Sequence, residues 1–219
     1  MDGNFTGLDV NRAKQDIERF RDTCDKISSG VYTSYSELHN FLKFHWAAPK
    51  AVEFSSIYPN EYYSFLQDFA DSSAHIVRGA SAAANSLARA NGLPASFDEY
   101  GINSGERVGL SEGIYLVDLS EQANGTTGMD VEGVKTQLDI FKSKVQKIIQ
   151  LFDGIANGIA FYDPDGRMVG QYNRGISAFK DRFESFATRI VTDLTGYLET
   201  ETDNILMAKE QATDYMRSA

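Results

Sequence analysis

Hydrophobic positions recur with a heptad spacing in two separate parts of the chain. The steps alternate between three and four residues, which places the side chains on one stripe of an α-helix. The first stripe consists of Val10, Ala13, Ile17, Phe20, Cys24, Ile27, Val31, Ser34, Leu38 and Phe41. The second consists of Val131, Val134, Leu138, Phe141, Val145, Ile148, Phe152, Ile155, Ile159 and Tyr162. The pattern predicts two helices of roughly 30–35 residues, each about 45–50 Å long.

The beginnings of these two segments are also alike in sequence. GLDVNRAKQDIERFRDTCDKI (7–27) and GMDVEGVKTQLDIFKSKVQKI (128–148) share Gly, Asp, Val, Lys, Phe, Lys and Ile at an offset of 121. Asp9 and Asp130 directly precede the first apolar position, where a side chain that caps the helix N-terminus belongs. The chain therefore contains an internal repeat, and each copy is predicted to begin with a capped helix.

Each predicted helix is followed by a break and then by a second amphipathic segment. In the first half, Asn60 follows Pro59 as an N-cap candidate, and Gly92-Leu-Pro94 predicts the end of the helix. In the second half, the stripe begins at Ile176 and continues to near Met216. SFLQDFADSSAHIV (64–77) aligns with AFKDRFESFATRIV (178–191), so the repeated unit is a helix–turn–helix.

The predicted fold is all-α. Two hairpins, at residues 1–92 and 128–219, bury their seams against each other as an elongated four-helix bundle. Residues 93–127 form a long irregular linker, in which GIYLVDL (113–119) fits either a short strand or a helical turn. A connection of this length is unusual in a compact bundle.

Composition excludes several classes of function. A net charge of −10 argues against nucleic acid as a partner. No apolar run approaches the roughly 18 residues of a membrane span, and MDGNFTGLDV lacks the basic and apolar regions of a cleaved signal peptide. The protein is therefore expected to be either cytoplasmic or exported by a route that uses another signal.

No motif for catalysis, cofactor binding or metal binding is recognisable. His39 and His45 are six residues apart, which is not the i, i+4 spacing of two ligands on one helix face. DPDG (163–166) lacks the later ligands of a calcium loop and predicts a tight turn. The single cysteine, Cys24, is expected in the core. An enzyme would need a pocket of acidic or histidine side chains formed across the bundle.

The breaks between the helices carry a possible motif. Trp46-Ala-Ala-Pro49 aligns with Phe161-Tyr-Asp-Pro164. A long amphipathic helix, a turn with Trp and a second long helix together resemble the Trp-x-Gly family of early-secreted-antigen-like type VII secretion substrates of Gram-positive bacteria and mycobacteria. Ala48 stands where that family has Gly, and Phe161 and Asp163 replace Trp and Gly in the second half. The likeness covers both hairpins and leaves the linker out.

The resemblance also implies an export signal, Tyr-x-x-x-Asp/Glu, late in or after the second helix. Tyr197 and Glu201 match this pattern on the last predicted helix, whereas the first half has Ala83 and Leu87 at the equivalent places. A packed tyrosine beside a solvated glutamate explains the same spacing equally well. In family dimers one partner presents the signal, so the chain looks like such a dimer fused into one polypeptide.

Two functions follow as alternatives. The first is a non-enzymatic secreted carrier, effector or partner-binding protein of a type VII system, recognised by the secretion ATPase or by a co-secreted helical protein. The second is a cytoplasmic adaptor or chaperone that binds helical partners through an open seam, or targets a toxin for export. A homodimer is an open alternative: a monodisperse monomer would favour the first function, and an obligate dimer would favour the adaptor. Both functions are expected to work without a cofactor.

Overall fold

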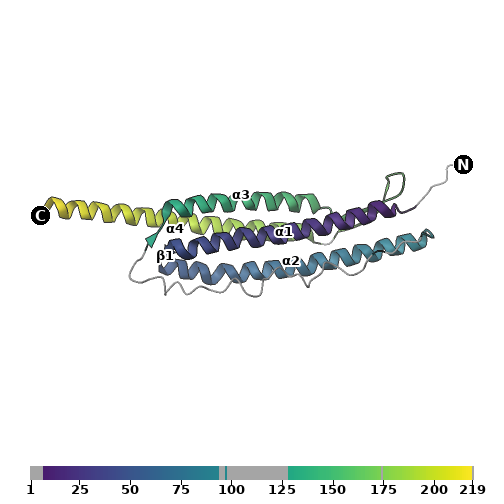
Figure 1. The fold of residues 1–219 in the computed structure, drawn as a ribbon, viewed down its shortest axis with the longest axis horizontal. Coiled ribbons are helices and arrows are strands. Elements are labelled where there is room, and N and C mark those ends of the chain that lie inside the picture. Colours follow the sequence, from purple (N-terminus) through teal and green to yellow (C-terminus); the bar gives the residue numbers. More distant parts are fainter. Residues whose placement is uncertain (1–6, 94–96, 98–127, 174, 219) are drawn as a thin grey trace.

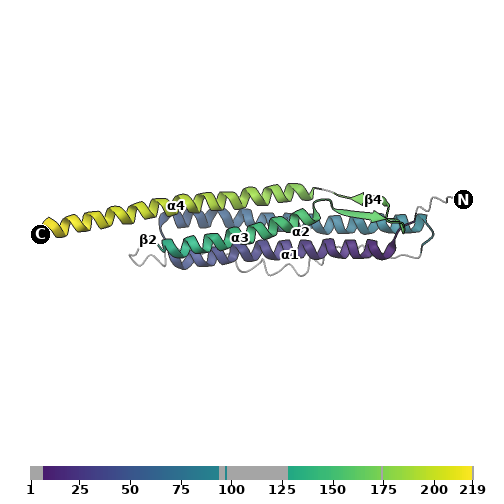
Figure 2. The same cartoon turned by 90° about the horizontal axis from the view of Figure 1, so that it is seen from above.

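The computed structural model describes residues 7–93, 97, 128–173 and 175–218. Four long helices lie side by side along one axis within these residues (Figures 1 and 2). They are α1 (Val10–His45), α2 (Pro49–Ala90), α3 (Val131–Ile155) and α4 (Ile176–Ser218). The predicted all-α fold of two long hairpins in an elongated bundle is confirmed. No described helix is both long enough and apolar enough to cross a bilayer.

The heptad stripes form the core of the bundle. On α1 the stripe is buried from Ala13 to Leu38, and on α3 it is buried from Val134 to Ile155. Helix α1 packs against both α2 and α3, so the contact between the first helices of the two repeats joins the hairpins. The shared sequence therefore lies where two similar helical surfaces must fit each other.

Both first helices begin at the predicted caps. The Asp9 carboxylate accepts a hydrogen bond from the Arg12 N–H at 3.0 Å, and the Asp130 carboxylate accepts one from Gly133 at the same distance. Their backbone N–H groups donate across the molecule, Asp9 to the Tyr162 carbonyl and Asp130 to the His45 carbonyl, each at 2.8 Å. Each repeat thus begins against the turn of the other one.

These two hydrogen bonds also correct the alignment of the turns. They make His45 equivalent to Tyr162, which places Trp46 over Asp163 rather than over Phe161. The second turn therefore differs from the first in structure as well as in its position in the alignment.

Helix α2 begins eleven residues before the predicted N-cap, at Pro49, and continues through Pro59. The predicted start at Asn60 is wrong, and the Asn60 side chain instead donates to the Ser56 carbonyl at 3.4 Å. Proline inside a helix loses one backbone hydrogen bond, but Tyr58 and Tyr62 on either side of it are both buried. Burial of this aromatic stripe offsets the local cost. The predicted end is confirmed, because Gly92 adopts a φ of 65° just after the helix.

Helix α3 is shorter than predicted. It ends at Ile155, and the chain then forms an antiparallel hairpin of β3 (Ile159–Tyr162) and β4 (Met168–Tyr172). Gly158 allows this change of direction, with a φ of 68° and a backbone carbonyl 2.3 Å from where a Cβ would lie. The predicted tight turn at 163–166 is confirmed, because the Gly166 N–H donates to the Asp163 carbonyl at 3.0 Å.

The β3–β4 hairpin covers the parts of α1 and α2 that extend beyond the end of α3 (Figure 2). Ile159 and Phe161 alternate inward and are buried. At the other end of the bundle, β1 (Trp46–Ala47) pairs with β2 (Gly128–Met129), with Trp46 opposite Met129. Both turn regions thus contain short β-strands, β1 paired with β2 at one end and β3 packed on α1 at the other.

Two linker residues, Leu93 and Phe97, are described, and Phe97 is anchored to the bundle. Phe97 is buried, its N–H donates to the Asn85 side-chain oxygen at 2.8 Å, and its carbonyl accepts from the Asn85 amide nitrogen at 3.0 Å. The GIYLVDL segment (113–119) lies outside the described residues.

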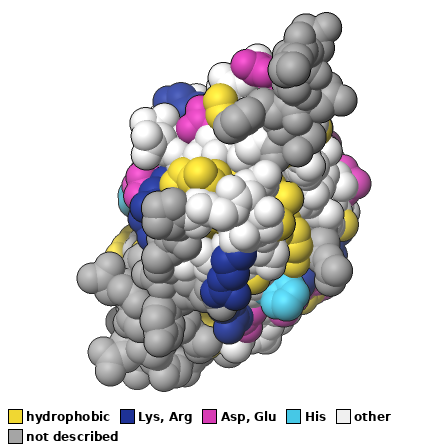
Figure 3. All heavy atoms as spheres, turned by 90° about the vertical axis from the view of Figure 1, so that its right-hand side faces the viewer, with side chains coloured by type: hydrophobic (Ala, Val, Ile, Leu, Met, Phe, Trp, Pro, Cys, Tyr) yellow, Lys and Arg dark blue, Asp and Glu magenta, His cyan; other side chains and the backbone are white. Residues whose placement is uncertain are grey.

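The C-terminal part of α4 projects beyond the other three helices (Figure 1). Leu198 is the last buried residue of α4, and every described side chain from Asp203 to Arg217 is exposed. At the opposite end of the molecule, no described helix projects in this way. The described hydrophobic side chains that face the viewer there lie in strips among charged and polar ones (Figure 3).

Candidate functional site at the Trp46 end of the bundle

Trp46 is the centre of an aromatic cluster where α1 gives way to α2. Its side chain is 2% exposed, and its ring centroid lies 5.9 Å from that of Phe54 on α2. The indole Nε1 is buried and has no hydrogen-bond partner among the described residues. Ala48 occupies the N-cap position of α2 without a side-chain cap, and Pro49 is the first helical residue. The Trp-x-x-Pro stretch therefore ends one helix and begins the next.

The structure brings Tyr197 onto Trp46. The two ring centroids are 5.2 Å apart and the planes are inclined by 43°. Glu201 lies one helical turn further along α4 and is partly buried, where the projecting part of the helix begins. Tyr197 and Trp46, which are 151 positions apart in the chain, thus meet at one end of the bundle, where Glu201 also lies.

Polar contacts between α2 and α4 hold this surface together. The Tyr58 hydroxyl donates to the Asp193 carboxylate. Next to this pair, the Arg189 guanidinium binds Glu61, and further along Arg182 binds Asp68 at 2.6 Å. The rings of Tyr58 and Phe54 are 4.6 Å apart, which connects the hydrogen bond to the Trp46 cluster.

The phenols at this end are poor acids. Burial, the hydrogen bond to Asp193 and the Asp193 charge all raise the pKa of Tyr58. Burial, followed by the charges of Glu53 and Asp193, raises the pKa of Tyr197, and Lys50 opposes this. Both hydroxyls therefore stay protonated at neutral pH and can donate hydrogen bonds.

The remaining predicted turn residues lie at the other end of the molecule. Phe161 is buried in β3 against α1, and Pro164 is exposed in the β3–β4 turn. Asp163 is buried and accepts a hydrogen bond from the Arg167 N–H at 2.7 Å. The two turn motifs therefore do not combine into one site. An alternating pattern around Asp-Pro-Asp-Gly was the signal for this hairpin.

Other chemically capable groups in the described residues do not converge. Cys24 is buried as expected, and burial raises the pKa of its thiol to about 12. A groove of about 1020 Å³ beside α1 contains Arg12, Asp16 and Arg19, but Asp16 pairs with both arginines, at 3.8 and 2.8 Å. Nowhere in the described chain do three or more His, Cys, Asp or Glu side chains gather as a potential metal site.

The fold defines the chain as an all-α protein made of two repeated helical hairpins with a small β-hairpin inserted in the second. No family model, no curated protein and no solved structure matches the chain.

Proposed function

We propose that the protein is a tandem Trp-x-Gly-like substrate of a type VII secretion system, exported without a cleaved signal peptide as a carrier, effector or partner-binding protein without enzymatic activity. The observation that supports it best is the contact between Trp46 and Tyr197. This contact places the turn motif, Tyr197 and Glu201 at the same end of the bundle. A secretion ATPase would bind the partly exposed Tyr197 and Glu201, and the buried Trp46 would hold Tyr197 in position.

The burial of the seams favours this function over that of an adaptor with an open seam. The stripes of α1 and α3 are buried within the bundle, and these two helices cover each other. The first hairpin here takes the place of the separate partner subunit that the family resemblance implies.

The test is secretion from a host with a type VII system, with and without its ATPase. We expect export of the wild type only when the ATPase is present. Tyr197→Ala and Glu201→Gln should reduce export at least roughly tenfold, if each side chain contributes a contact worth about 1.4 kcal/mol or more.

Two matched variants separate recognition from folding. Glu199→Gln changes an exposed acid on the opposite face of the same helix and should leave export unchanged. Tyr197→Phe keeps the ring against Trp46 and reports on the hydroxyl alone. Export that continues without the ATPase, or that is insensitive to both Tyr197→Ala and Glu201→Gln, would refute the proposed function.

A further inference from the structure

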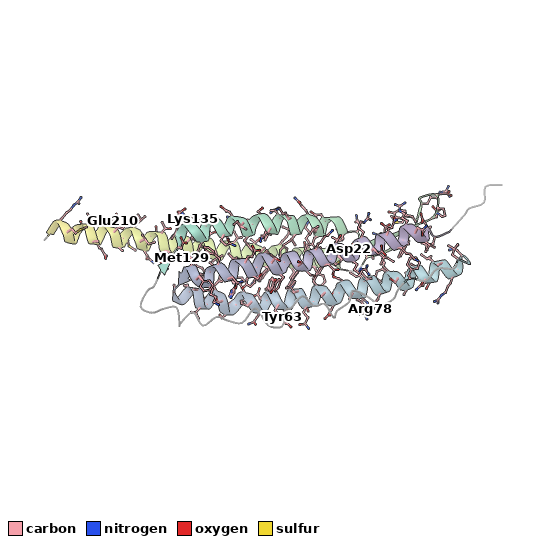
Figure 4. The ribbon with its side chains drawn as sticks, in the orientation of Figure 1. Asp22, Tyr63, Arg78, Met129, Lys135 and Glu210 are labelled. Atoms are coloured by element: carbon pink, nitrogen blue, oxygen red, sulfur yellow. The ribbon has the colours of Figure 1, made fainter. Side chains whose placement is uncertain are left out.

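The end of α4, residues 199–218, projects beyond the other three helices, and every described side chain from Asp203 to Arg217 is exposed. Ile205 is 39% exposed, Leu206 and Met207 are each 54% exposed, and Met216 is 75% exposed. Figure 4 labels Glu210 far out on this segment, well beyond Met129 and Lys135 at the end of the bundle. We call this segment the tail.

The tail is amphipathic, and its apolar face continues the buried seam of α4. Ile190, Leu194 and Leu198 are buried in the bundle. At 100° per residue, the same stripe continues outward through Ile205, Ala208, Ala212 and Met216. Four acids, Glu199, Asp203, Glu210 and Asp214, lie on the opposite side of the helix. Leu206 and Met207 lie off this stripe, Met207 on the acidic side.

A helix of this length needs a partner to be stable. Residues 203–217 extend about 22 Å at a rise of 1.5 Å per residue, and isolated helices of about 12–15 residues are marginal in water. The tail cannot fold back on its own bundle, because it is the straight continuation of α4 (Figure 1). Among the described residues, nothing covers its apolar face.

The charged residues on the apolar face favour a second copy of this chain as the partner of the tail. Within the tail, the helical spacing places only Glu201 and Lys209 on this side, and their signs are opposite. If two tails lie antiparallel with a two-fold axis near Ile205, Glu201 of one copy is level with Lys209 of the other, and the pair occurs twice. A parallel arrangement would instead place Glu201 against Glu201.

The same arrangement covers a second exposed apolar surface. Phe44, at the end of α1, is 69% exposed, and Val52, near the start of α2, is 52% exposed. Both lie at the end of the bundle from which the tail leaves, so an antiparallel partner would bring its tip with Met216 back towards them. Two tails and two bundle ends then contribute to one interface, and a specific dimer buries roughly 1,200–2,000 Å² in total.

We infer that the tail is a dimerisation element: two copies of this chain associate through antiparallel packing of their α4 tails around Ile205, with Glu201 of each copy beside Lys209 of the other. This inference does not depend on the proposed secretion function.

The test is the oligomeric state of the full chain, measured by light scattering and analytical ultracentrifugation. We expect a wild-type dimer. Ile205→Asp should weaken dimerisation roughly 100-fold, because the change acts twice in a symmetric interface. Met207→Asp introduces the same charge on the opposite face of the tail, at a position that is 54% exposed against 39% for Ile205, and should remain dimeric. A monomeric wild type, or equal behaviour of the two variants, would overturn the inference.

A charge exchange tests the register. Glu201→Lys should weaken the dimer by facing Lys209, and Glu201→Lys combined with Lys209→Glu should restore it. An equal mixture of the Glu201→Lys and Lys209→Glu single variants should form heterodimers. Failure of both the double variant and the mixture to restore dimerisation would overturn the antiparallel arrangement. The double variant also lacks the acid at position 201, so restored dimers without export would separate dimerisation from the secretion proposal.

Discussion

The rings of Trp46 and Tyr197 pack 5.2 Å apart, although one residue ends the first hairpin's opening helix and the other lies on the last helix of the second hairpin. The contact joins the two repeats at one end of the bundle. It also means that substitutions at Tyr197 affect stability as well as any recognition, so the two effects must be measured separately.

The Trp46–Tyr197 contact predicts a measurable stability effect. Tyr197→Ala removes a partly buried ring and should lower the free energy of unfolding by about 1–3 kcal/mol. Tyr197→Phe keeps the ring and should change it by less than about 0.5 kcal/mol. Urea unfolding followed by the fluorescence of Trp46, the single tryptophan, reports directly on the contact. Equal stability of Tyr197→Ala and wild type would contradict the packing.

The hydrogen bond from Tyr58 to Asp193 predicts a difference between two tyrosines on α2. Tyr58→Phe leaves the partly buried Asp193 carboxylate without this donor and should cost about 1.5–3 kcal/mol. Tyr63→Phe is the matched control, because Tyr63 is 41% exposed on the outer side of α2 (Figure 4). It should be neutral within about 0.5 kcal/mol. Chemical denaturation of both variants is the measurement, and similar losses would argue against the bond.

Two glycines near the end of α3 should respond in opposite ways to alanine. Gly158→Ala forces a Cβ against the Tyr172 carbonyl at a positive φ and should destabilise the protein by about 2–4 kcal/mol. Gly154→Ala meets nothing within 4 Å inside the helix and should stabilise by up to about 1 kcal/mol. Thermal unfolding of the pair tests whether α3 ends where the structure places it. A stable Gly158→Ala protein would mean that the helix continues further.

His39 should make the bundle less stable in acid. It is 6% exposed and its ring nitrogens have no hydrogen-bond partner among the described residues. Burial, followed by the charge of Lys43, lowers the pKa of His39 below 6.5. The folded state therefore binds fewer protons than the unfolded state in mild acid. Stability is fully present above pH 6.5 and is lost as the pH falls through the folded-state pKa.

The check is the free energy of unfolding between pH 7.5 and 5. His39→Phe keeps an aromatic ring beside Tyr35, whose centroid lies 5.8 Å from that of His39, and should remove a slope of at most about 1.4 kcal/mol per pH unit. Parallel pH profiles for wild type and His39→Phe would exclude this role.

Sequence periodicity predicted the helices well where burial follows one stripe. The seams of α1 and α3, both aspartate caps and the end of α2 at Gly92 follow from local patterns that the structure confirms. The two wrong helix boundaries have different physical causes. At Pro59 a strong local signal for a helix boundary yields to the burial of Tyr58 and Tyr62. At Ile159, inward-facing positions fit the helical stripe, but Gly158 and the Asp163–Gly166 turn favour a hairpin.

The residues of the candidate site can be recognised in the sequence, but their contacts cannot. Trp46, Tyr197 and Glu201 are recognisable in the sequence by motif, but no local pattern indicates that Tyr197 packs on Trp46 or that Tyr58 donates to Asp193. Phe161 and Pro164 also match in sequence, yet they lie at the opposite end of the bundle. Contacts across such distances depend on how the two hairpins dock, and that is decided by the shapes of both partners together.

The sequence by itself determined that the chain is helical, that it is duplicated and which stripe of each first helix is buried, because helical periodicity and capping are local properties. Only the tertiary structure decided that the repeats dock through α1 and α3, that α3 stops early to make room for a β-hairpin, and that α4 extends beyond its neighbours. Those features depend on the relative lengths of packed elements, which become visible only when the helices lie side by side.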